Sequence, residues 1–372
     1  MRIAQLANFV GPTSGGMKTA LDALARGYVA SGVERLLVVP GPTDDRYETQ
    51  AGDVVQVRAP RVGGGYRLIV EPWKVVEALT RFAPTSLEVS DKFTLMPVSW
   101  WARRQGIGTV LFSHERMDEY MLRYTRLDTT TKVSIGLLNR ILVRSFDALL
   151  VTSDYARHEF ATLAAAAECP IVQVPLGVDL DRFRPRHHTR SEVLRLIHVG
   201  RLSREKSPDL SVGTAVELHR RGVPLRLDVY GDGPQRDEVE ELAGDAPVVF
   251  HGHVSDRDEI AARLAEADVA LSVCPGETFG LAVLEALASG TPVVTADRGG
   301  ARELVDADCG ACAAPEPSAL ADAVLDLAAR PLRRTRAAAR SRAERFPWSR
   351  TVAEMLDLHA AISAGLAEPA YA

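Results

Sequence analysis

The first half of the chain alternates short apolar segments with longer segments in which apolar residues recur every three or four positions. In the segment 17–30, Leu21, Leu24 and Tyr28 follow this spacing, which predicts an amphipathic helix, and Gly32 ends it. The short apolar segments predict strands, and the connections between them are long enough for helical crossovers. The predicted strands are RIAQLANF at 2–9, ERLLVVPG at 34–41, VVQVRAP at 54–60, SLEVS at 86–90, TVLFSHE at 109–115 and DALLVTSD at 147–154.

The second half repeats this alternation after a polar segment at 179–190, which predicts a linker between two domains. Helices are predicted at 208–221, around 235–243 and at about 280–288. The predicted strands are LRLIHVG at 194–200, LRLDVYG at 225–231, VVFHGHV at 248–254, DVALSVCPG at 268–276 and PVVTA at 292–296. Ordered alternation of this kind predicts an α/β fold with two doubly wound parallel sheets, whose ligands bind at the carboxyl ends of the strands. We therefore expect the active site in the cleft between the two halves.

Composition and charge limit the function classes. The 372 residues are 46% apolar and 25% charged, which is typical of a soluble globular protein of two domains. Lys and Arg number 44 against 49 Asp and Glu, and the net charge of −5 argues against a dedicated nucleic-acid-binding protein. The most apolar segment, at 134–151, contains Arg140, Arg144 and Asp147, so no membrane-spanning helix is expected. Four cysteines make no disulfide framework and the first residues do not match a signal peptide, so we expect a cytoplasmic protein.

The segment CPGETFGLAVLEALASGTPVV carries the most informative motif. Glu277 and Glu285 lie eight residues apart, and in one helix this spacing would separate them by about 12 Å along the axis. The separation exceeds the roughly 5 to 9.5 Å between the carboxyl groups of a glycosidase, and it suits two ends of one extended ligand. A helix start near Phe279, Gly280 and Leu281 offers free main-chain N–H groups to an anion. A solvated helix is the plain alternative, but the flanking Pro-Gly and Gly-Thr-Pro favour a loop at a strand end.

A basic loop, HVGRLSREKSPDL, follows the first predicted strand of the second half. Ser207 and Pro208 predict the N-cap and first position of the next helix, so Arg201 and Lys206 fall in a strand-to-helix loop. Planar Arg donors and a Lys charge at such a place can hold a diphosphate, with Arg204 as a third candidate. A basic loop alone is more often a solvated surface, and the glutamate motif in the same half favours the functional interpretation.

The segment GPTSGGMKTALDALARG nearly matches a phosphate-binding P-loop. That motif needs Lys immediately after its last Gly, whereas Met17 stands between Gly16 and Lys18. One extra helical residue turns the Lys by about 100°, so we reject a nucleoside-triphosphatase. The turn at Gly15 and Gly16 still lets the backbone approach a ligand closely at a helix start.

Metal-binding motifs are incomplete. Three short pairs are of ligand type: Asp179 with Asp181, Asp306 with Asp308, and Cys309 with Cys312. None has a third carboxylate, a second CxxC or a His at ligand spacing, so we expect no metal and interpret the cysteines as loop thiols. His114 follows a predicted strand and would point into the expected cleft, although a lone His is more often structural.

Taken together, these segments resemble the GT-B-fold retaining glycosyltransferases of glycosyltransferase family 4, along nearly the whole chain. The matching pieces, in order, are the GG turn at 15–16, His114, PLGVDLDRF at 175–183, GRLSREK at 200–206, YGDGPQRDEVEEL at 230–242, FHGHV at 250–254, the glutamate motif, DRGGARELV at 297–305 and FPWSR at 346–350. The resemblance implies two Rossmann-like domains facing across a cleft. It places an acceptor-binding domain at 1–183, with 350–372 packing back on it, and a nucleotide-sugar-binding domain at 184–349.

The resemblance also implies roles for individual residues. In the donor domain, side chains would contact the diphosphate, the ribose and the sugar, and main-chain groups would face the phosphate or sugar. These residues are Arg201 and Lys206 for the diphosphate, Glu285 for the ribose, Glu277 for the sugar hydroxyls, Phe279, Gly280 and Leu281 through the backbone, and Val254 beside the base. His114 would contact the transferred sugar, and the turn at Gly15 and Gly16 would approach the diphosphate.

The expected reaction is hexosyl transfer from a nucleotide sugar to a hydroxyl group with retention of configuration, without a metal or other cofactor. Arg201 and Lys206 would stabilise the developing diphosphate anion. GDP-mannose is the preferred donor, with UDP-glucose and UDP-N-acetylglucosamine as alternatives. A nucleotide-sugar epimerase on the same fold and a non-catalytic sensor are the competing functions.

The acceptor is expected to be a lipid or a phosphorylated small molecule. Arg123 and Arg126 follow His114, and the stretch 134–150 is amphipathic and basic. Such segments suit peripheral contact between the first domain and anionic lipids at the inner membrane face. The arginine-rich run at 330–345 is instead interpreted as a solvated helix face.

Overall fold

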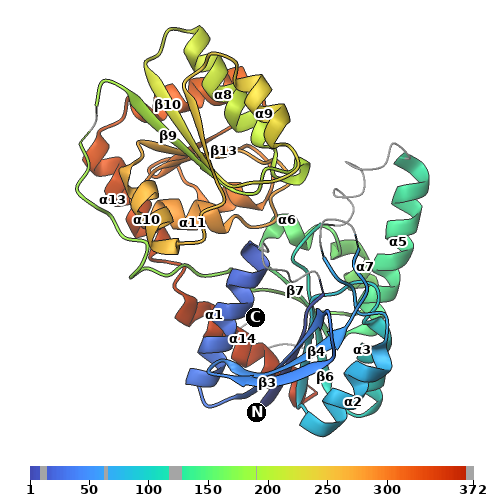
Figure 1. The fold of residues 1–372 in the computed structure, drawn as a ribbon. Helices are drawn as coiled ribbons and strands as arrows, with labels where there is room; N and C mark the ends of the chain where they lie inside the picture. The colour runs from blue at the N-terminus through green and yellow to red at the C-terminus, as the bar shows by residue number, and fades with distance from the viewer. Residues whose placement is uncertain (9–14, 63–65, 117–127, 190, 366–372) are drawn as a thin grey trace. The chain divides into compact units, whose positions relative to one another are not determined.

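The structure is a computed structural model that describes residues 1–8, 15–62, 66–116, 128–189 and 191–365, with side chains in the helix from 128 described from 134 onwards (Figure 1). The chain divides into two compact units. The first consists of Met1–Pro175 with Trp348–Ala372, and the second of Leu176–Pro347. The polar segment at 179–190 therefore belongs to the second unit, where the Val178 N–H donates to Phe346 O at 2.9 Å.

The first unit contains an eight-stranded sheet in the order β3-β4-β2-β1-β5-β6-β7-β8. Its strands are β1 Arg2–Leu6, β2 Glu34–Gly41, β3 Asp45–Thr49, β4 Gly52–Arg58, β5 Ser86–Val89, β6 Gly108–Phe112, β7 Ala148–Val151 and β8 Ile171–Gln173. Neighbouring strands pair in parallel except β3 with β4, which are antiparallel. The sequence analysis did not predict β3 or β8. Every residue of β3 is exposed, so this edge strand carries no apolar alternation.

The helices of this unit are α1 Gly16–Ala30, α2 Pro72–Phe82, α3 Met96–Arg104, α5 Asp128–Ser145, α6 Asp154–Arg157, α7 Ala161–Ala166 and α14 Trp348–Ser363. The predicted first helix is confirmed within one residue, and Leu21, Leu24 and Tyr28 are buried on its inner face. Apolar residues of β1, β2, β5, β6 and β7 form the core with α2 and α3.

The last helix, α14, packs against α1, β5 and β6, and it is tied to them by buried polar groups. The Glu88 carboxylate in β5 accepts hydrogen bonds from Gln5 Nε2 at 3.0 Å and from the Tyr28 hydroxyl at 3.3 Å. His359 of α14 lies with Nε2 3.4 Å from Glu88 Oε2 and Nδ1 2.9 Å from Ser86 Oγ. Because all these groups are buried, each depends on the others for its hydrogen bonds.

The second unit contains a six-stranded parallel sheet in the order β11-β10-β9-β12-β13-β14. Its strands are β9 Leu194–Val199, β10 Leu225–Tyr230, β11 Val248–Gly252, β12 Val269–Ser272, β13 Val293–Ala296 and β14 Gly310–Ala313. Its helices are η2 Arg204–Lys206, α8 Pro208–Arg220, α9 Arg236–Ala243, α10 Arg257–Glu266, α11 Leu281–Ala288, η3 Gly300–Leu304, α12 Pro317–Ala328 and α13 Leu332–Ala343. The two parallel sheets confirm the predicted α/β fold class, and β14 was not predicted.

The prediction of a solvated face for the arginine-rich run was wrong, because three arginines of α13 bind main-chain carbonyls. Arg336 is 8% exposed and donates to Ala265 O at 2.8 Å and to Ala267 O at 3.0 Å. Arg340 donates to the carbonyls of Leu180, Phe183 and Ala288, and Arg342 to those of Glu303 and Leu304. Most of these carbonyls lie at helix ends, where the helix itself supplies no donor.

We expect Glu88→Ala to lower the free energy of unfolding of the first unit by about 3 kcal/mol, because buried donors of Gln5 and Tyr28 lose their acceptor. All four tryptophans lie in this unit, so fluorescence in urea reports on its unfolding. The control is Glu77→Ala, which breaks an exposed pair with Arg81 and should cost less than about 0.5 kcal/mol. Equal losses in the two variants would contradict a stabilising role for the buried cluster.

Candidate active site

In the second unit, the loop after β12 leads into α11 through a left-handed glycine. Gly280 has φ +101°, and a Cβ added there would lie 3.1 Å from the Cβ of Ala301, so the position favours glycine. The helix begins at Leu281, one residue after the predicted start, and Phe279 is buried beside it. Glu277 lies before this helix, so the predicted separation of about 12 Å along one helix axis does not apply. The first turn of α11 presents main-chain N–H groups at the carboxyl edge of the sheet.

The basic loop after β9 meets the loop after β12. Lys206 Nζ lies 2.7 Å from Glu277 Oε2, with the two side chains 40% and 18% exposed. The pair forms because β9 and β12 are parallel neighbours, so both strands end at the same edge. The Cys274 thiol lies 2.9 Å from Glu205 O and further links the two loops.

Arg201 and Ser207 lie near the two ends of the basic loop. Arg201 is half-buried and lies two residues after the end of β9. Ser207 occupies the predicted N-cap position of α8, but it has φ +48° and its side chain makes no capping hydrogen bond. Its hydroxyl points instead to Cys274 Sγ, at 3.9 Å.

The loops after β9 and β10 approach so closely that glycine is required between them. A Cβ on Gly231, whose φ is +151°, would lie 1.7 Å from Gly200 O. The glycines of the YGDG segment therefore allow the loop after β10 to pass against the basic loop.

Glu285 projects from α11 toward the start of α10. It is 6% exposed, and the guanidinium of Arg257 donates a hydrogen bond to its Oε1. Burial raises the pKa of Glu285, and the charge of Arg257 opposes that shift. The Arg257 guanidinium also lies over the ring of Phe183, 5.2 Å from its centroid. The sequence analysis missed Arg257, because one arginine in the first turn of a helix looks like any solvated residue.

Val254 lies half-buried in the loop between β11 and α10. Asp256 caps the following helix and accepts hydrogen bonds from the N–H groups of Asp258 at 2.8 Å and Glu259 at 3.4 Å. This loop and the loops that carry Lys206 and Glu277 all follow carboxyl ends of strands in one sheet.

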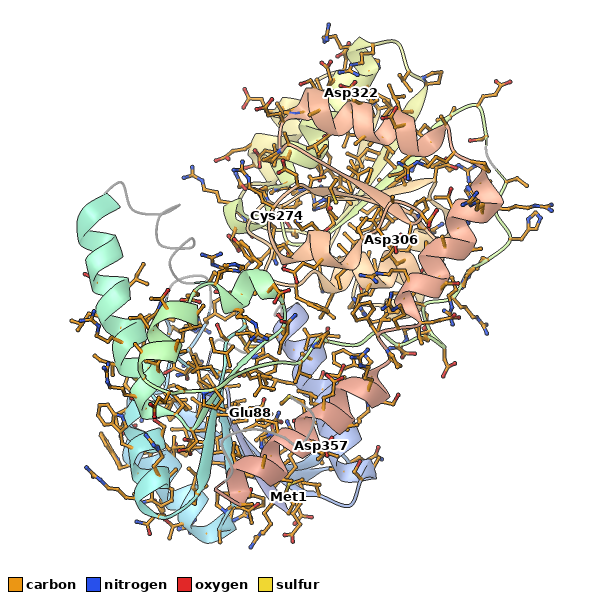
Figure 2. All side chains as sticks on the ribbon, turned by 180° about the vertical axis from the view of Figure 1, so that it is seen from behind. Met1, Glu88, Cys274, Asp306, Asp322 and Asp357 are labelled. Carbon is orange, nitrogen blue, oxygen red and sulfur yellow. The ribbon has the colours of Figure 1, made fainter. Side chains whose placement is uncertain are left out.

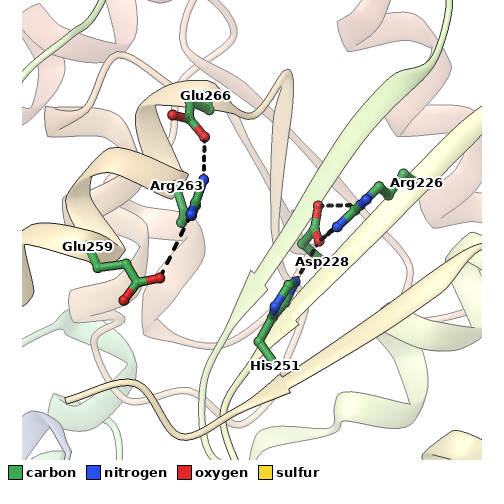
Figure 3. Close-up of polar contacts among 6 residues, drawn as sticks. All are labelled: Arg226, Asp228, His251, Glu259, Arg263 and Glu266. Carbon is green, nitrogen blue, oxygen red and sulfur yellow. Dashed lines mark hydrogen bonds and ion pairs between the residues drawn. The ribbon is translucent and has the colours of Figure 1, made fainter. Parts of the chain in front are cut away.

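A separate groove of about 540 Å³ lies over β9, β10 and β11 beside α10. Arg226 and His251 both bond the Asp228 carboxylate, at 2.8 Å and 2.6 Å (Figure 3). Although burial raises the pKa of Asp228, these hydrogen bonds bring it below its usual value. Arg263 pairs with Glu266 at 3.1 Å in the same groove. Since the charged groups drawn there bind one another, we interpret them as a structural network.

In the first unit, the three predicted site residues lie at the carboxyl edge of its sheet. Gly16 begins α1, and Gly15 precedes it with open space where a Cβ would stand. Lys18 pairs with Asp22 at 2.6 Å on the exposed side of this helix. Residues 11–14 of the P-loop-like segment, and Arg123 with Arg126, lie outside the described residues.

His114 is held by its neighbours in β5 and β6. Its Nε2 lies 3.0 Å from Ser90 Oγ, and its ring lies 3.9 Å from the ring of Phe112, centroid to centroid. Burial lowers the pKa of His114 to about 4, so the imidazole is neutral at pH 7 and can donate one N–H. Lys92, paired with buried Glu159 at 3.0 Å, donates to Glu115 O at 2.6 Å and supports the loop that carries His114.

Within the described ranges, no group of three His, Cys, Asp or Glu side chains could hold a metal ion. Asp306 accepts from the N–H groups of Asp308 and Cys309, as a turn residue does. The prediction of loop thiols holds for Cys309, which is buried in the turn before β14, and was wrong for Cys312, which lies in β14. None of the described helices is long and apolar enough to cross a membrane.

Two family models match the chain. Residues 15–177 match a glycosyl transferase 4-like domain, and residues 194–330 match the glycosyl transferases group 1.

Curated relatives extend over most of the chain. It is 41% identical over 368 residues to the GDP-mannose-dependent alpha-(1-6)-phosphatidylinositol dimannoside mannosyltransferase of Mycobacterium tuberculosis, covering 96% of this chain and 95% of that protein. It is 30% identical over 288 residues to the D-inositol 3-phosphate glycosyltransferase of Saccharomonospora viridis, covering 70% and 67%.

Among solved structures, the sucrose-phosphate synthase of Thermosynechococcus elongatus aligns with a TM-score of 0.79 and 19% identity, covering 98% of this chain and 99% of that one. Anabaena HepE in complex with UDP and glucose aligns with a TM-score of 0.73 and 18% identity, covering 96% and 99%. At these identities the likeness shows the fold.

Proposed function

Since this chain belongs to the GT-B glycosyltransferases of family 4 and transfers a sugar from a nucleotide-sugar donor, we propose that the sugar is mannose and the donor GDP-mannose. The relative that shares 41% of its residues along 96% of this chain is named for that donor and that sugar. The observation that carries the site is the contact between Lys206 and Glu277, because it joins a cation suited to diphosphate with a carboxylate suited to sugar hydroxyls.

In the proposed complex, the donor lies along the carboxyl edge of the second sheet. We assign residues to the parts of the donor as the resemblance implies. In the second unit, Arg201 and Lys206 bind the diphosphate, Glu277 the mannose hydroxyls, Glu285 the ribose and Val254 the base, and the backbone of Phe279, Gly280 and Leu281 faces the phosphate or sugar. In the first unit, Gly15 and Gly16 are assigned to the diphosphate and His114 to the mannose. Neutral His114 contributes an N–H donor without adding a positive charge beside the oxocarbenium-like sugar.

We propose that transfer retains the anomeric configuration. The bond between the anomeric carbon and the diphosphate oxygen breaks, and the acceptor oxygen bonds to the same face of that carbon. The acceptor proton passes to the departing diphosphate oxygen. The charges of Arg201 and Lys206 stabilise the developing anion, so they contribute most in the transition state.

For the acceptor, we propose a mannose-bearing phosphatidylinositol at a membrane surface. The mycobacterial relative is named for such a lipid. In the first unit, the exposed faces of α3 and α5 combine apolar and basic side chains, and Trp100 of α3 donates to Ser145 Oγ of α5 at 2.8 Å. Trp100, Leu137 and Ile141 are 43%, 61% and 38% exposed.

The charge of this α3–α5 face, defined by Trp100, Arg104, Leu137, Arg140, Ile141 and Arg144, suits an anionic bilayer. Its three arginines are exposed and, among the described residues, pair with no carboxylate. Neither α3 nor the stretch of α5 from residue 134 to 145 contains Asp or Glu. Aromatic and apolar side chains with surrounding arginines are typical of surfaces that lie in the headgroup region.

Glu285→Ala tests the donor assignment. We expect the variant to bind GDP about 1.5 to 3 kcal/mol more weakly by calorimetry, because ribose hydroxyls lose a charged acceptor. The control is Glu266→Ala, which removes an exposed carboxylate of α10.

Wild-type assays with GDP-mannose, UDP-glucose and UDP-N-acetylglucosamine identify the donor, and proton NMR identifies the anomer. Conversion of the donor to its epimer, without transfer, would favour the epimerase.

Transfer is expected to persist undiminished in EDTA, because the cations that stabilise the leaving diphosphate are side chains. The assay compares initial rates before and after chelation. Loss of transfer in EDTA with recovery on adding Mg²⁺ or Mn²⁺ would show that a divalent cation takes part.

Vesicle co-sedimentation tests the membrane face. We expect wild type to pellet with vesicles that contain phosphatidylinositol and to stay in solution with phosphatidylcholine alone, and Arg140→Glu with Arg144→Glu to abolish pelleting. The matched control, Arg333→Glu with Arg334→Glu, makes the same charge change on exposed positions of α13 and should leave binding intact. Equal pelleting with both vesicles, or of both double variants, would favour a soluble acceptor such as an inositol phosphate.

A further inference from the structure

In the proposed site, the carboxylate that binds the ribose is that of Glu285, and it is held in place by Arg257, a residue that has no assigned role. Glu285 is more than nine-tenths buried, yet the hydrogen bond from Arg257 reaches Oε1 alone. In the described part of the chain, no group bonds its Oε2. That oxygen can therefore accept a hydrogen bond from a ligand hydroxyl.

Arg257 is the charge that acts on this carboxylate. Other charged groups around α11 are engaged elsewhere: Lys206 pairs with Glu277, and Arg336 and Arg340 of α13 donate to the carbonyls of Ser289 and Ala288 at the far end of the helix. Burial pushes the pKa of Glu285 upward, and the charge and hydrogen bond of Arg257 are the influences that lower it. Without Arg257, the Glu285 carboxyl group would stay protonated up to a higher pH.

The segment at 179–183 fixes Arg257 in turn. Phe183 is 2% exposed, and its ring lies under the Arg257 guanidinium. The preceding residue, Arg182, pairs with Asp258 at 2.9 Å, so adjacent residues of this segment engage adjacent residues of α10. A guanidinium stacked on a ring keeps its N–H edge free to donate, which here reaches Glu285.

We propose that Arg257, oriented by Phe183, is a positioning residue that keeps Glu285 ionised and aims its free oxygen at the ribose hydroxyls of the nucleotide. The inference rests on the proposed function, because it takes Glu285 as the ribose acceptor. It gives the PLGVDLDRF segment a place in donor binding: Phe183 orients Arg257, which orients Glu285. Arg257 acts through Glu285 and requires no contact of its own with the donor.

Calorimetric titration with GDP tests the proposal at about pH 8.5 and about pH 6. We compare the Kd of Arg257→Met with that of wild type, and we expect their ratio to rise roughly tenfold from the higher to the lower pH. The reason is that each unit by which the pKa of Glu285 exceeds the pH lowers the ionised fraction of its carboxyl group tenfold. Protonation of GDP cancels in this ratio. Arg257→Lys keeps the charge and should hold the ratio nearly constant with pH. Arg263→Met, on the same helix and paired with Glu266, should match wild type.

Phe183→Leu should weaken GDP binding about two- to fivefold in the wild-type background and leave it unchanged in the Arg257→Met background. An additional loss in that background would mean that Phe183 acts independently of Arg257. A pH-independent ratio for Arg257→Met would assign Arg257 a packing role and overturn the proposal. If wild type binds no GDP, the guanine assignment fails instead, and the same ratios are measured with UDP, which carries the same ribose.

Discussion

Parallel strands end at one edge of a sheet, and this constraint brings together the residues of the proposed donor site from segments far apart in the sequence. β9 and β12 are neighbours, so the loops that follow them meet and Lys206 reaches Glu277. β10 and β11 extend the same edge, where Gly231 lets one loop pass against Gly200 and the next loop carries Val254 toward α10. The carboxyl edge of the second sheet thus carries both positive and negative side chains, such as Lys206 and Glu277, together with the main-chain N–H groups at the start of α11. Figure 2 draws the side chains of both units and labels Cys274, which belongs to the loop after β12.

Both units bury carboxylates, and each keeps them within a set of donors. In the first unit, the Glu88 carboxylate accepts hydrogen bonds from Gln5 and Tyr28, and His359 lies beside it. In the second unit, the Asp268 carboxylate accepts a hydrogen bond from the main-chain N–H of Arg195 at 2.9 Å. In the proposed site, Oε2 of Glu285 accepts no hydrogen bond from the described residues and is left for the ribose. The low dielectric around a buried carboxylate strengthens the hydrogen bonds that it accepts. Burial also favours the neutral form of Glu285 and Arg257 opposes this, so the buried acceptor and the positioned arginine act together.

Apolar periodicity was sufficient to predict most of the fold. The strands β2, β9, β10 and β13 and the helices α1 and α8 fall within a residue or two of their predicted bounds, because one face of each is buried. β3 was missed because its side chains are all exposed, so its sequence shows no apolar alternation. Sequence reasoning failed for Arg336 and Arg340, since a helical arginine that binds carbonyls has the same spacing as one in solvent. Arg257 was missed for the same reason: its role depends on Phe183 and Glu285, which are distant in sequence.

The two substrates call for different kinds of recognition. A nucleotide sugar has charges and hydroxyls at fixed separations, so its binding needs a few side chains held by tight loops. Such loops have characteristic sequence motifs and can be predicted from the sequence. The proposed acceptor is confined to a bilayer and so already concentrated at a surface, and modest affinity for that surface would be enough. On the proposed membrane face, arginines would contribute about 1 kcal/mol each near an anionic bilayer, and Trp100 and Leu137 would add a partial apolar contact. Binding of this strength would be reversible and would weaken with salt, as the exchange of a water-soluble donor at a lipid surface requires.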